Sequence, residues 1–266
     1  MRVINTWRGR AGIASAIFVV LSIFGPARAT DWCATTIAAD VVLDQDLVCP
    51  GDGLIVGADD IDIDLHSHAI TGSGVGVGIR MQGRRDVRVH GGLIRNFESG
   101  ILAANSTNIV VIESQFTENR EAIFLNGSVG CEVKENLIWN NSLRGVMVRP
   151  SSARQSTRNL IAENVLIENA SGVLIFGQPL NVVRENLISR SARAALHLTG
   201  GGASGNLFSE NHVTENAAGI EFGPGWVGNT FVENRIEANS CGTTGATDGN
   251  TFRENVFTAN LVDECP

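Results

Sequence analysis

Short apolar runs, each broken after a few residues by Asn, Gly or Ser, recur along most of this chain. A phrase that begins with Glu-Asn and places an apolar residue two positions after that Asn occurs six times. Two weaker copies precede it, "GGLIRN" anchored at Gly91 and "ESQFTEN" anchored at Ser114. A repeat of about 22 residues predicts a solenoid of stacked coils. The first Asn of each complete phrase is Asn136, Asn164, Asn186, Asn211, Asn234 or Asn255.

Three apolar positions per repeat predict three short strands per coil. The runs are rich in branched residues and too short for helical periodicity, and Asn and Gly at their ends indicate bends. Stacking such coils forms parallel sheets with strands about 4.8 Å apart. The inward positions lie three before the anchor (Val111, Val133, Ile161, Val183, Phe208, Phe231, Phe252), two after it (Leu93, Phe116, Ile138, Leu166, Ile188, Val213, Ile236, Phe257), and nine or ten after it (Ile101, Ile123, Val146, Val173, Leu196, Ile220).

A second Asn column follows the first at a fixed offset. Because Asn tolerates left-handed backbone and its amide can bond to the same amide one coil away, both columns are interpreted as structural ladders at bends rather than as ligand sites. The second column comprises Asn96, Asn119, Asn141, Asn169, Asn216, Asn239 and Asn260, with Ser191 as the exception.

These repeats, and a first coil that reads "IDIDLHSHAITGSG", resemble the right-handed parallel β-helix proteins of the pectin-lyase-like superfamily. The repeat class is similar to that of polysaccharide-acting enzymes and of periplasmic NosD-type proteins. The resemblance covers the chain from about Leu54 onward and implies an all-β solenoid of about nine coils. It implies little about chemistry, because one fold hosts many activities. The copper role of NosD-type proteins is disfavoured, since the five His are scattered and Met is sparse.

The N-terminus has the pattern of a secretory signal. Arg residues precede an apolar run, and "ARA" ends at Ala29, so the mature chain is expected to begin at Thr30 and to be secreted or periplasmic. It is expected not to span a membrane after cleavage. Removing the basic leader makes the chain more acidic than the net charge of −8 for the whole sequence, which argues against nucleic acid as a partner.

The cysteines agree with export and with capped solenoid ends. Cys33 and Cys49 flank the segment before the first coil, and Cys241 and Cys265 flank the last one, so each pair is expected to form a disulfide. Cys131 is left over and is interpreted as a buried thiol. The expected organisation is an N-terminal cap at 30–53 and one β-helix domain at 54–266.

The first coil offers a candidate catalytic patch. Asp60, Asp62, Asp64 and His66 are expected on the outer face of one strand, and an offset of 24 residues sets Arg84, Asp86, Arg88 and His90 beside them. His66, His90, Asp64 and Arg88 supply the base, acid and cation that a uronate lyase or epimerase needs. Asp62 and Asp86 are a candidate Ca²⁺ pair. The alternative is plain cross-strand ion pairing, Asp60 with Arg84 and Asp64 with Arg88.

A column of Glu residues precedes the anchors and continues the line of His66 and His90. Like charges one strand apart repel, so the column requires solvation, neighbouring Arg or bound cations. A solvated bend is favoured over a cation-binding stripe. The column comprises Glu113, Glu135, Glu163, Glu185, Glu210, Glu233 and Glu254.

A third candidate is an apolar stripe on an outer face, made by Leu102, Phe124, Met147 and Leu174. Stacked apolar residues on the outside of a solenoid favour a partner surface, a sugar-stacking platform, or a cover by an insertion. Two coils carry insertions, at 149–157 and 199–204, which in repeat proteins tend to lie on the binding face.

These features predict an exported β-helix that engages a polysaccharide, with lyase and epimerase chemistry left open. The alternative is a non-catalytic solenoid, periplasmic or extracellular, that is structural or binds a partner such as an envelope protein. No cofactor is required by the sequence, and Ca²⁺ is the one that the first coil suggests.

Overall fold

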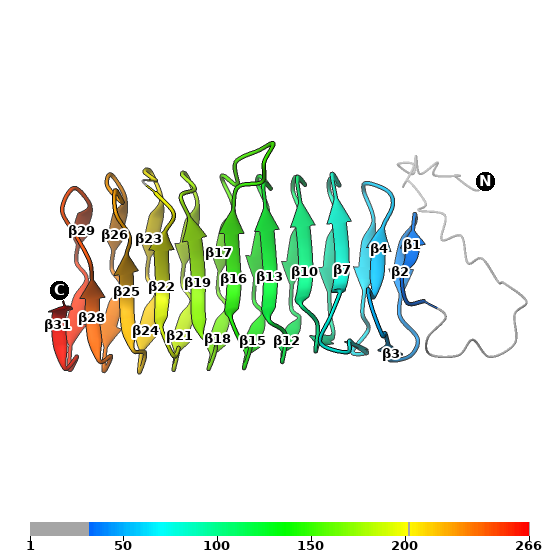
Figure 1. Cartoon of the computed structure of the whole chain (residues 1–266), viewed down its shortest axis with the longest axis horizontal. Coiled ribbons are helices and arrows are strands. Elements are labelled where there is room, and N and C mark those ends of the chain that lie inside the picture. Colours follow the sequence, from blue (N-terminus) through cyan, green and yellow to red (C-terminus); the bar gives the residue numbers. More distant parts are fainter. Residues whose placement is uncertain (1–31, 202, 266) are drawn as a thin grey trace, which may run out of the picture.

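The computed structural model describes residues 32–201 and 203–265, and the expected signal segment 1–29 lies outside them. Within those residues the chain winds through three parallel sheets, A, B and C, without a helix (Figure 1). Each strand pairs with the strand three places further along the chain, so every coil contributes one strand to each sheet. This is the predicted parallel β-helix, with about ten coils rather than nine. No segment of the described chain has the length and apolarity of a membrane-crossing helix.

Sheet A holds the longest strands. Its members, in order along the axis, are β1 (Thr35–Ile37), β4 (Leu54–Val56), β7 (Val77–Gln82), β10 (Ser99–Ala104), β13 (Glu121–Asn126), β16 (Arg144–Arg149), β19 (Ser171–Phe176), β22 (Ala194–Thr199), β25 (Ala218–Phe222), β28 (Cys241–Thr244) and β31 (Val262–Cys265).

Sheets B and C are built from strands of two or three residues. Sheet B contains β2 (Val41–Val42), β5 (Asp62–Asp64), β8 (Arg88–His90), β11 (Val110–Ile112), β14 (Glu132–Lys134), β17 (Leu160–Ala162), β20 (Val182–Arg184), β23 (Leu207–Ser209), β26 (Thr230–Val232) and β29 (Thr251–Arg253). Sheet C contains β3 (Leu47–Val48), β6 (Ala69–Thr71), β9 (Leu93–Arg95), β12 (Gln115–Thr117), β15 (Leu137–Trp139), β18 (Val165–Ile167), β21 (Leu187–Ser189), β24 (His212–Thr214), β27 (Arg235–Glu237) and β30 (Val256–Thr258).

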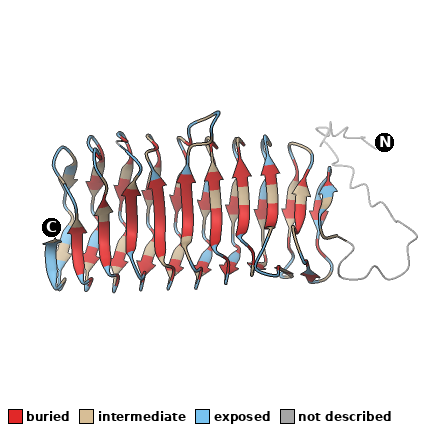
Figure 2. Cartoon of the chain, viewed as in Figure 1, coloured by how far each residue is buried: buried red, intermediate tan, exposed pale blue. Residues whose placement is uncertain are grey.

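The core is a column of branched and aromatic side chains between the three sheets (Figure 2). The predicted inward positions fill it: Ile123 on sheet A, Val133 on sheet B and Ile138 on sheet C are fully buried. Phe208, Phe231 and Phe252 of sheet B stack ring on ring in successive coils. The described part of the expected cap, residues 32–53, contains β1, β2 and β3, so it is itself a coil. The coil that the sequence analysis took as the first, with Asp62 and Asp64 on β5, is the second coil of the structure, and its patch keeps the name first-coil patch.

Asparagine ladders occupy the bends, as the sequence predicts for most members. In the bend between sheets B and C, the Asn136 backbone N–H and side-chain amide both donate to Asn164 Oδ1 at 3.0 Å. Asn164 donates to Asn186 in the same way, and the pattern continues to Asn255. The second ladder lies in the bend between sheets C and A and has two parts, Asn119 to Asn169 and Ser191 to Asn260. It is interrupted between them, because the buried Ser191 hydroxyl has no hydrogen-bond partner.

The left-handed backbone belongs to the residue before each ladder position, not to the ladder Asn itself. Glu135 has a φ of 54° and Glu163 a φ of 58°, each immediately before a ladder Asn. The whole predicted Glu column has this conformation, so its side chains point away from the core at the bend between sheets B and C. Arg184 contacts two of them, Glu163 at 3.8 Å and Glu185. All seven Glu residues of the column are exposed at this bend, as a solvated bend requires.

A third ladder was missed by the sequence analysis. Asn159, Asn181, Asn206, Asn229 and Asn250 repeat the same bonds in the bend between sheets A and B. Cys131 occupies the ladder position one coil earlier, and its backbone N–H donates to Asn159 Oδ1 at 3.0 Å. Each of these residues stands five positions before an anchor Asn, so the repeat spacing in the sequence carried this signal.

One predicted anchor was placed one residue too early. Leu93 pairs with Gln115 and Ile94 with Phe116, so Ile94, not Leu93, faces the core. The same slip removes Asn96 from the second ladder, because Phe97 stands at that level and its N–H donates to Asn119 Oδ1. A slip of one residue reverses which face of a strand is buried, and burial of Ile94 and Phe97 fixes the register.

Both predicted disulfides are present: Cys33 bonds to Cys49, and Cys241 to Cys265. Cys131 is a buried free thiol, and burial raises its pKa to about 11. The thiol is thus protonated and unreactive at neutral pH.

Replacing a ladder residue tests the role of the bends. Asn141→Ala removes the acceptor of the Asn119 amide and the donor to Phe116 O, and each buried polar group left unpaired costs about 1–3 kcal/mol. We expect at least about 2 kcal/mol of lost stability in urea unfolding. Ser142→Ala, at the exposed next residue, is the control. Equal stabilities of the two variants would contradict the ladder's role.

Candidate functional site

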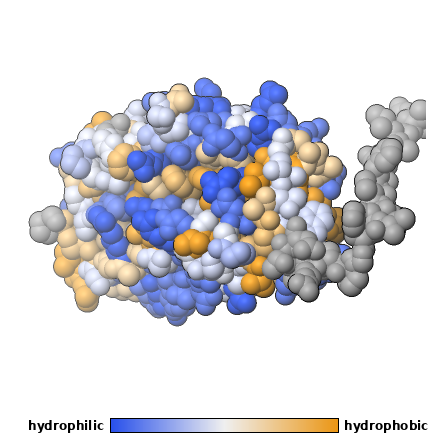
Figure 3. Space-filling view, turned by 45° about the vertical axis from the view of Figure 1, so that its right-hand side comes forward, coloured by the Kyte–Doolittle hydropathy of each residue, from blue (hydrophilic) through white to orange (hydrophobic). Residues whose placement is uncertain are grey.

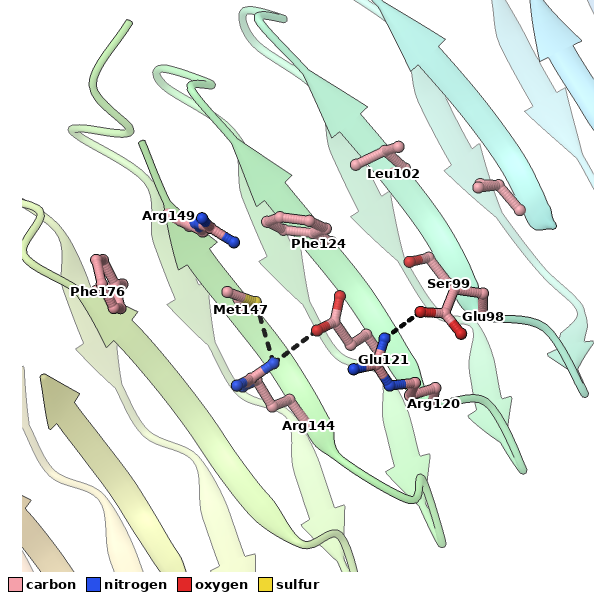
Figure 4. A pocket seen from close by; sticks show the side chains of 11 residues that line it. Glu98, Ser99, Leu102, Arg120, Glu121, Phe124, Arg144, Met147, Arg149 and Phe176 are labelled. Atoms are coloured by element: carbon pink, nitrogen blue, oxygen red, sulfur yellow. Dashed lines mark hydrogen bonds and ion pairs between the residues drawn. The ribbon is translucent and has the colours of Figure 1, made fainter. Parts of the chain in front are cut away.

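A groove crosses the outer face of sheet A, running along the axis from β7 to β19 (Figure 4). Its volume is about 520 Å³. Three of the four residues of the predicted apolar stripe, Leu102, Phe124 and Met147, line it. They stand side by side because the register pairs Leu102 with Phe124 and Phe124 with Met147. Leu174 continues the column beside Met147 but is only 2% exposed and does not line the groove. Met147 is itself only 4% exposed, so Leu102 and Phe124 supply most of the accessible apolar surface.

Ion pairs form one side of this groove. Glu98 and Arg120 contact each other, and Glu121 Oε1 accepts a hydrogen bond from Arg144 Nη1 at 2.6 Å. The same Arg144 nitrogen lies 3.6 Å from Met147 Sδ. These residues precede the stripe residues by three or four positions, at or just before the starts of β10, β13 and β16, so they lie on one flank of the apolar residues. Figure 4 shows the two pairs as successive steps along the axis.

The opposite side carries Arg149 and Phe176. The Arg149 guanidinium lies over the Phe176 ring, 5.7 Å from its centroid. Both residues end their strands, β16 and β19, two positions after the stripe. The groove thus has an apolar floor between a flank of paired charges and a flank with an aromatic ring and a cation. Figure 3, an oblique view of the molecule, shows hydrophilic areas mixed with smaller hydrophobic ones on the solenoid surface.

The insertion at 149–157 does not cover the apolar stripe. Arg154 donates to Asn105 O at 3.2 Å and to Thr107 Oγ1 at 3.0 Å, and Ser151 Oγ lies 2.6 Å from Asn105 Oδ1. The loop therefore folds back over the bends that follow β10 and leaves the groove open. The covered-stripe interpretation was wrong for this insertion.

Beyond Leu174, the next two residues in the stripe column, His197 and Glu221, are titratable. His197 pairs with Leu174 in register, and its Nε2 is 3.7 Å from Glu221 Oε1. Arg193 donates two hydrogen bonds to Glu221, which lower the pKa of that carboxyl group. Burial lowers the pKa of His197; Glu221 opposes this effect, and Arg193 and Arg144 add to it. His197 is therefore neutral at pH 7.

The first-coil patch has a different register from the predicted one. The offset between β5 and β8 is 26 residues, which pairs Asp62 with Arg88 and Asp64 with His90. Asp60–Arg84 and Asp64–Arg88 are therefore not cross-strand pairs, and Asp62 does not face Asp86. Asp86 accepts a hydrogen bond from the Asn108 amide at 2.9 Å instead. The two-residue difference arises because the bend after β5 holds residues 65–68, whereas the bend after β8 holds only residues 91–92; Ile63 and Val89 still pair and face inward.

Within the patch, His90 is the central group. Its Nε2 lies 3.0 Å from Asp62 Oδ2 and its Nδ1 3.7 Å from Asp64 Oδ1. His66 lies at a bend with a φ of 46° and its side chain is 68% exposed, 3.8 Å from Asp64. His66 and His90 are not in one column with the Glu residues, because His90 pairs with Ile112, one residue before Glu113. The patch brings His90, Asp62 and Asp64 together and leaves His66 at its margin.

The fold and its outward grooves define a class, the parallel β-helix proteins. The family model described as "Periplasmic copper-binding protein (NosD)" matches residues 60–226 and 154–263, and the chain belongs to this family. A search of curated protein sequences found no significant match.

Solved structures share the fold at low identity. An alginate lyase from Paenibacillus sp. str. FPU-7 is 12% identical with a TM-score of 0.58, over 86% of this chain and 98% of that one. The periplasmic alginate epimerase AlgG is 13% identical with a TM-score of 0.60, over 80% and 62%. An exopolygalacturonase from Thermotoga maritima is 10% identical with a TM-score of 0.54, over 85% and 79%. At these identities the likeness establishes the fold alone.

The residues present do not fit a copper site. Among residues 32–201 and 203–265, no three His, Cys, Asp or Glu side chains are grouped as metal ligands. Copper is typically held by His, Cys and Met, yet four cysteines are in disulfides, Cys131 is buried, and Met81 is enclosed in the core. The proposed Ca²⁺ pair Asp62–Asp86 also lacks the expected pairing.

Burial of His197 predicts a pH dependence of stability. The pKa of His197 in the folded protein is below the unfolded value of about 6.5. The contribution of neutral His197 to the free energy of unfolding is therefore complete above that pH and is lost as pH falls through the folded pKa. We expect unfolding free energy to fall from pH 7.5 to pH 5.5, above the range in which Glu221 titrates. His197→Gln is expected to flatten this slope, measured by urea unfolding at each pH. The exposed His66→Gln is the control, and an unchanged slope in His197→Gln would refute the assignment.

Proposed function

We propose that this protein is an exported, periplasmic or secreted, β-helix that binds a polysaccharide along the groove on sheet A. The carrying observation is the combination of an apolar floor, Leu102, Phe124 and Met147, with hydrogen-bonding charges on its flank. Sugars present apolar C–H faces and hydroxyl edges, which such a surface matches. An extended polymer running along the axis would meet the same arrangement in successive coils.

Binding, rather than cleavage, is the activity that this groove supports best. A general base must hold a proton-accepting group free for the substrate. Both groove carboxylates, Glu98 and Glu121, are engaged by arginines. Two disulfides agree with an oxidising compartment, and the family description names the periplasm. An envelope protein remains the alternative partner for the same apolar floor.

Truncating the floor tests the binding proposal. Phe124→Ala is expected to weaken polysaccharide binding at least about tenfold, because burying an aromatic side chain at a contact is worth more than about 1.4 kcal/mol. Affinity electrophoresis against a panel of neutral and acidic polymers would select the ligand, and calorimetry would give Kd. Leu137→Ala, a partly exposed apolar residue on the outer face of sheet C, is the control. Binding that survives Phe124→Ala unchanged would refute this site.

The first-coil patch is the place where lyase or epimerase chemistry is proposed, with His90 as the base beside Asp64 and Arg88 as the cation. If the protein cleaves a uronate polymer by elimination, unsaturated ends absorb in the ultraviolet. We expect His90→Ala or Arg88→Ala to abolish any such signal, with His66→Ala weaker because His66 lies at the margin. No absorbance change on any uronate polymer, with or without Ca²⁺, would exclude lyase chemistry on those polymers.

A further inference from the structure

The groove flank formed by Arg149 and Phe176 differs from the flank of paired charges. Arg120 and Arg144 each contact a Glu, whereas the contact that orients Arg149 is the Phe176 ring. An aromatic face holds a guanidinium in place without supplying a negative charge. The Arg149 charge therefore stays available to a ligand. Three arginines against two glutamates line the groove, on a chain whose net charge is −8.

The Phe176 ring is held from its other side by the next coil. A Cβ placed on Gly200 would lie 2.4 Å from Phe176 Cδ1, so the glycine backbone packs directly against the ring. Gly200 has a φ of 83°, which a residue with a side chain adopts only with strain. The ring is thus placed between Arg149 of one coil and Gly200 of another.

Both insertions found in the sequence contribute to this arrangement. Arg149 is the first residue of the insertion at 149–157, and Gly200 belongs to the insertion at 199–204. Arg149, Phe176 and Thr199 fall in one outward column. Val148 pairs with Ile175, which places Arg149 beside Phe176, and Phe176 pairs with Thr199. The two irregular coils therefore border the same end of the groove.

We propose that the groove selects an acidic polysaccharide and that Arg149 binds an anionic group of the sugar. This inference rests on the proposed function and names its substrate class. A guanidinium presents a planar fork that donates two parallel hydrogen bonds to a carboxylate. Arg149 holds that fork at the lip of the apolar floor, where the charged edge of a uronic acid would lie while its C–H face contacts Phe124. Phe176 and Gly200 are positioning residues for the cation.

Two matched polymer pairs test the proposal on the chain from Thr30 onward. Polygalacturonate is compared with its methyl ester, which has the same backbone without the charges, and dextran sulfate with dextran. We expect the charged member of at least one pair to bind at least about tenfold tighter, the value of one charge-assisted contact. The pair that shows the difference identifies carboxylate or sulfate as the group.

Variants at Arg149 assign the selectivity. Arg149→Gln is expected to reduce affinity for the charged polymer about tenfold and to leave affinity for its neutral partner unchanged. Arg149→Lys keeps the charge but loses the fork, so it is expected to fall between the two. Arg253→Gln, an exposed Arg on the outer face of sheet B, is the control and is expected to bind as the parent does.

The possible failures are distinguishable. Equal affinity for charged and neutral polymers, or an Arg149→Gln variant that retains full selectivity, overturns the acidic-sugar inference and leaves the groove as a general polysaccharide site. Absence of binding to all four polymers, or binding that ignores Phe124→Ala, overturns the proposed function and this inference together.

Discussion

The structure depends on buried asparagine amides that bond from coil to coil inside the bends. A bend turns backbone N–H and C=O groups toward the core, where each costs free energy unless it is paired. Asn136 solves this with one side chain: its oxygen accepts the Ser114 N–H, and its nitrogen donates to Val111 O and to Asn164. Three such ladders satisfy the bends between the sheets and allow sheets B and C to be built from strands of two or three residues.

This regular interior determines how the residues on the outer face are arranged. Since the ladders lock the register, outward residues at equivalent positions form straight columns one strand apart. The column that contains Leu102, Phe124 and Met147 is therefore a continuous floor, and the residues before and after it become two flanks. Arg144 and Glu121 pair on one flank, and Arg149 and Phe176 stack on the other. Outward residues can therefore differ from coil to coil while the core residues stay the same.

The features that recur with the repeat could be predicted from the sequence, whereas the features that depend on bend length or packing could not. The inward residues, two ladders and the outward stripe follow from repeat spacing, because most coils keep the same order of strands and bends. Both disulfides follow from the position of each cysteine pair at an end of the solenoid. The offset between Asp62 and Arg88 could not be read that way, because the bend after β5 is two residues longer than the bend after β8. Leu93 was chosen over Ile94 because both are apolar, and only packing decides which faces inward. Arg149 and Phe176 each stand two positions after a stripe residue, Met147 and Leu174, and only this spacing links them to the groove in the sequence.

Methyl NMR of methionine tests the central claim, that the sheet A groove is where the ligand binds. The chain from Thr30 onward has two methionines, Met147 in the groove and Met81 enclosed in the core. With ¹³C-labelled methyl groups, titration with a bound oligosaccharide is predicted to shift the Met147 signal in a saturable way and to leave Met81 in place. Saturable binding measured by calorimetry with neither signal shifted would contradict the account and place the ligand elsewhere on the solenoid.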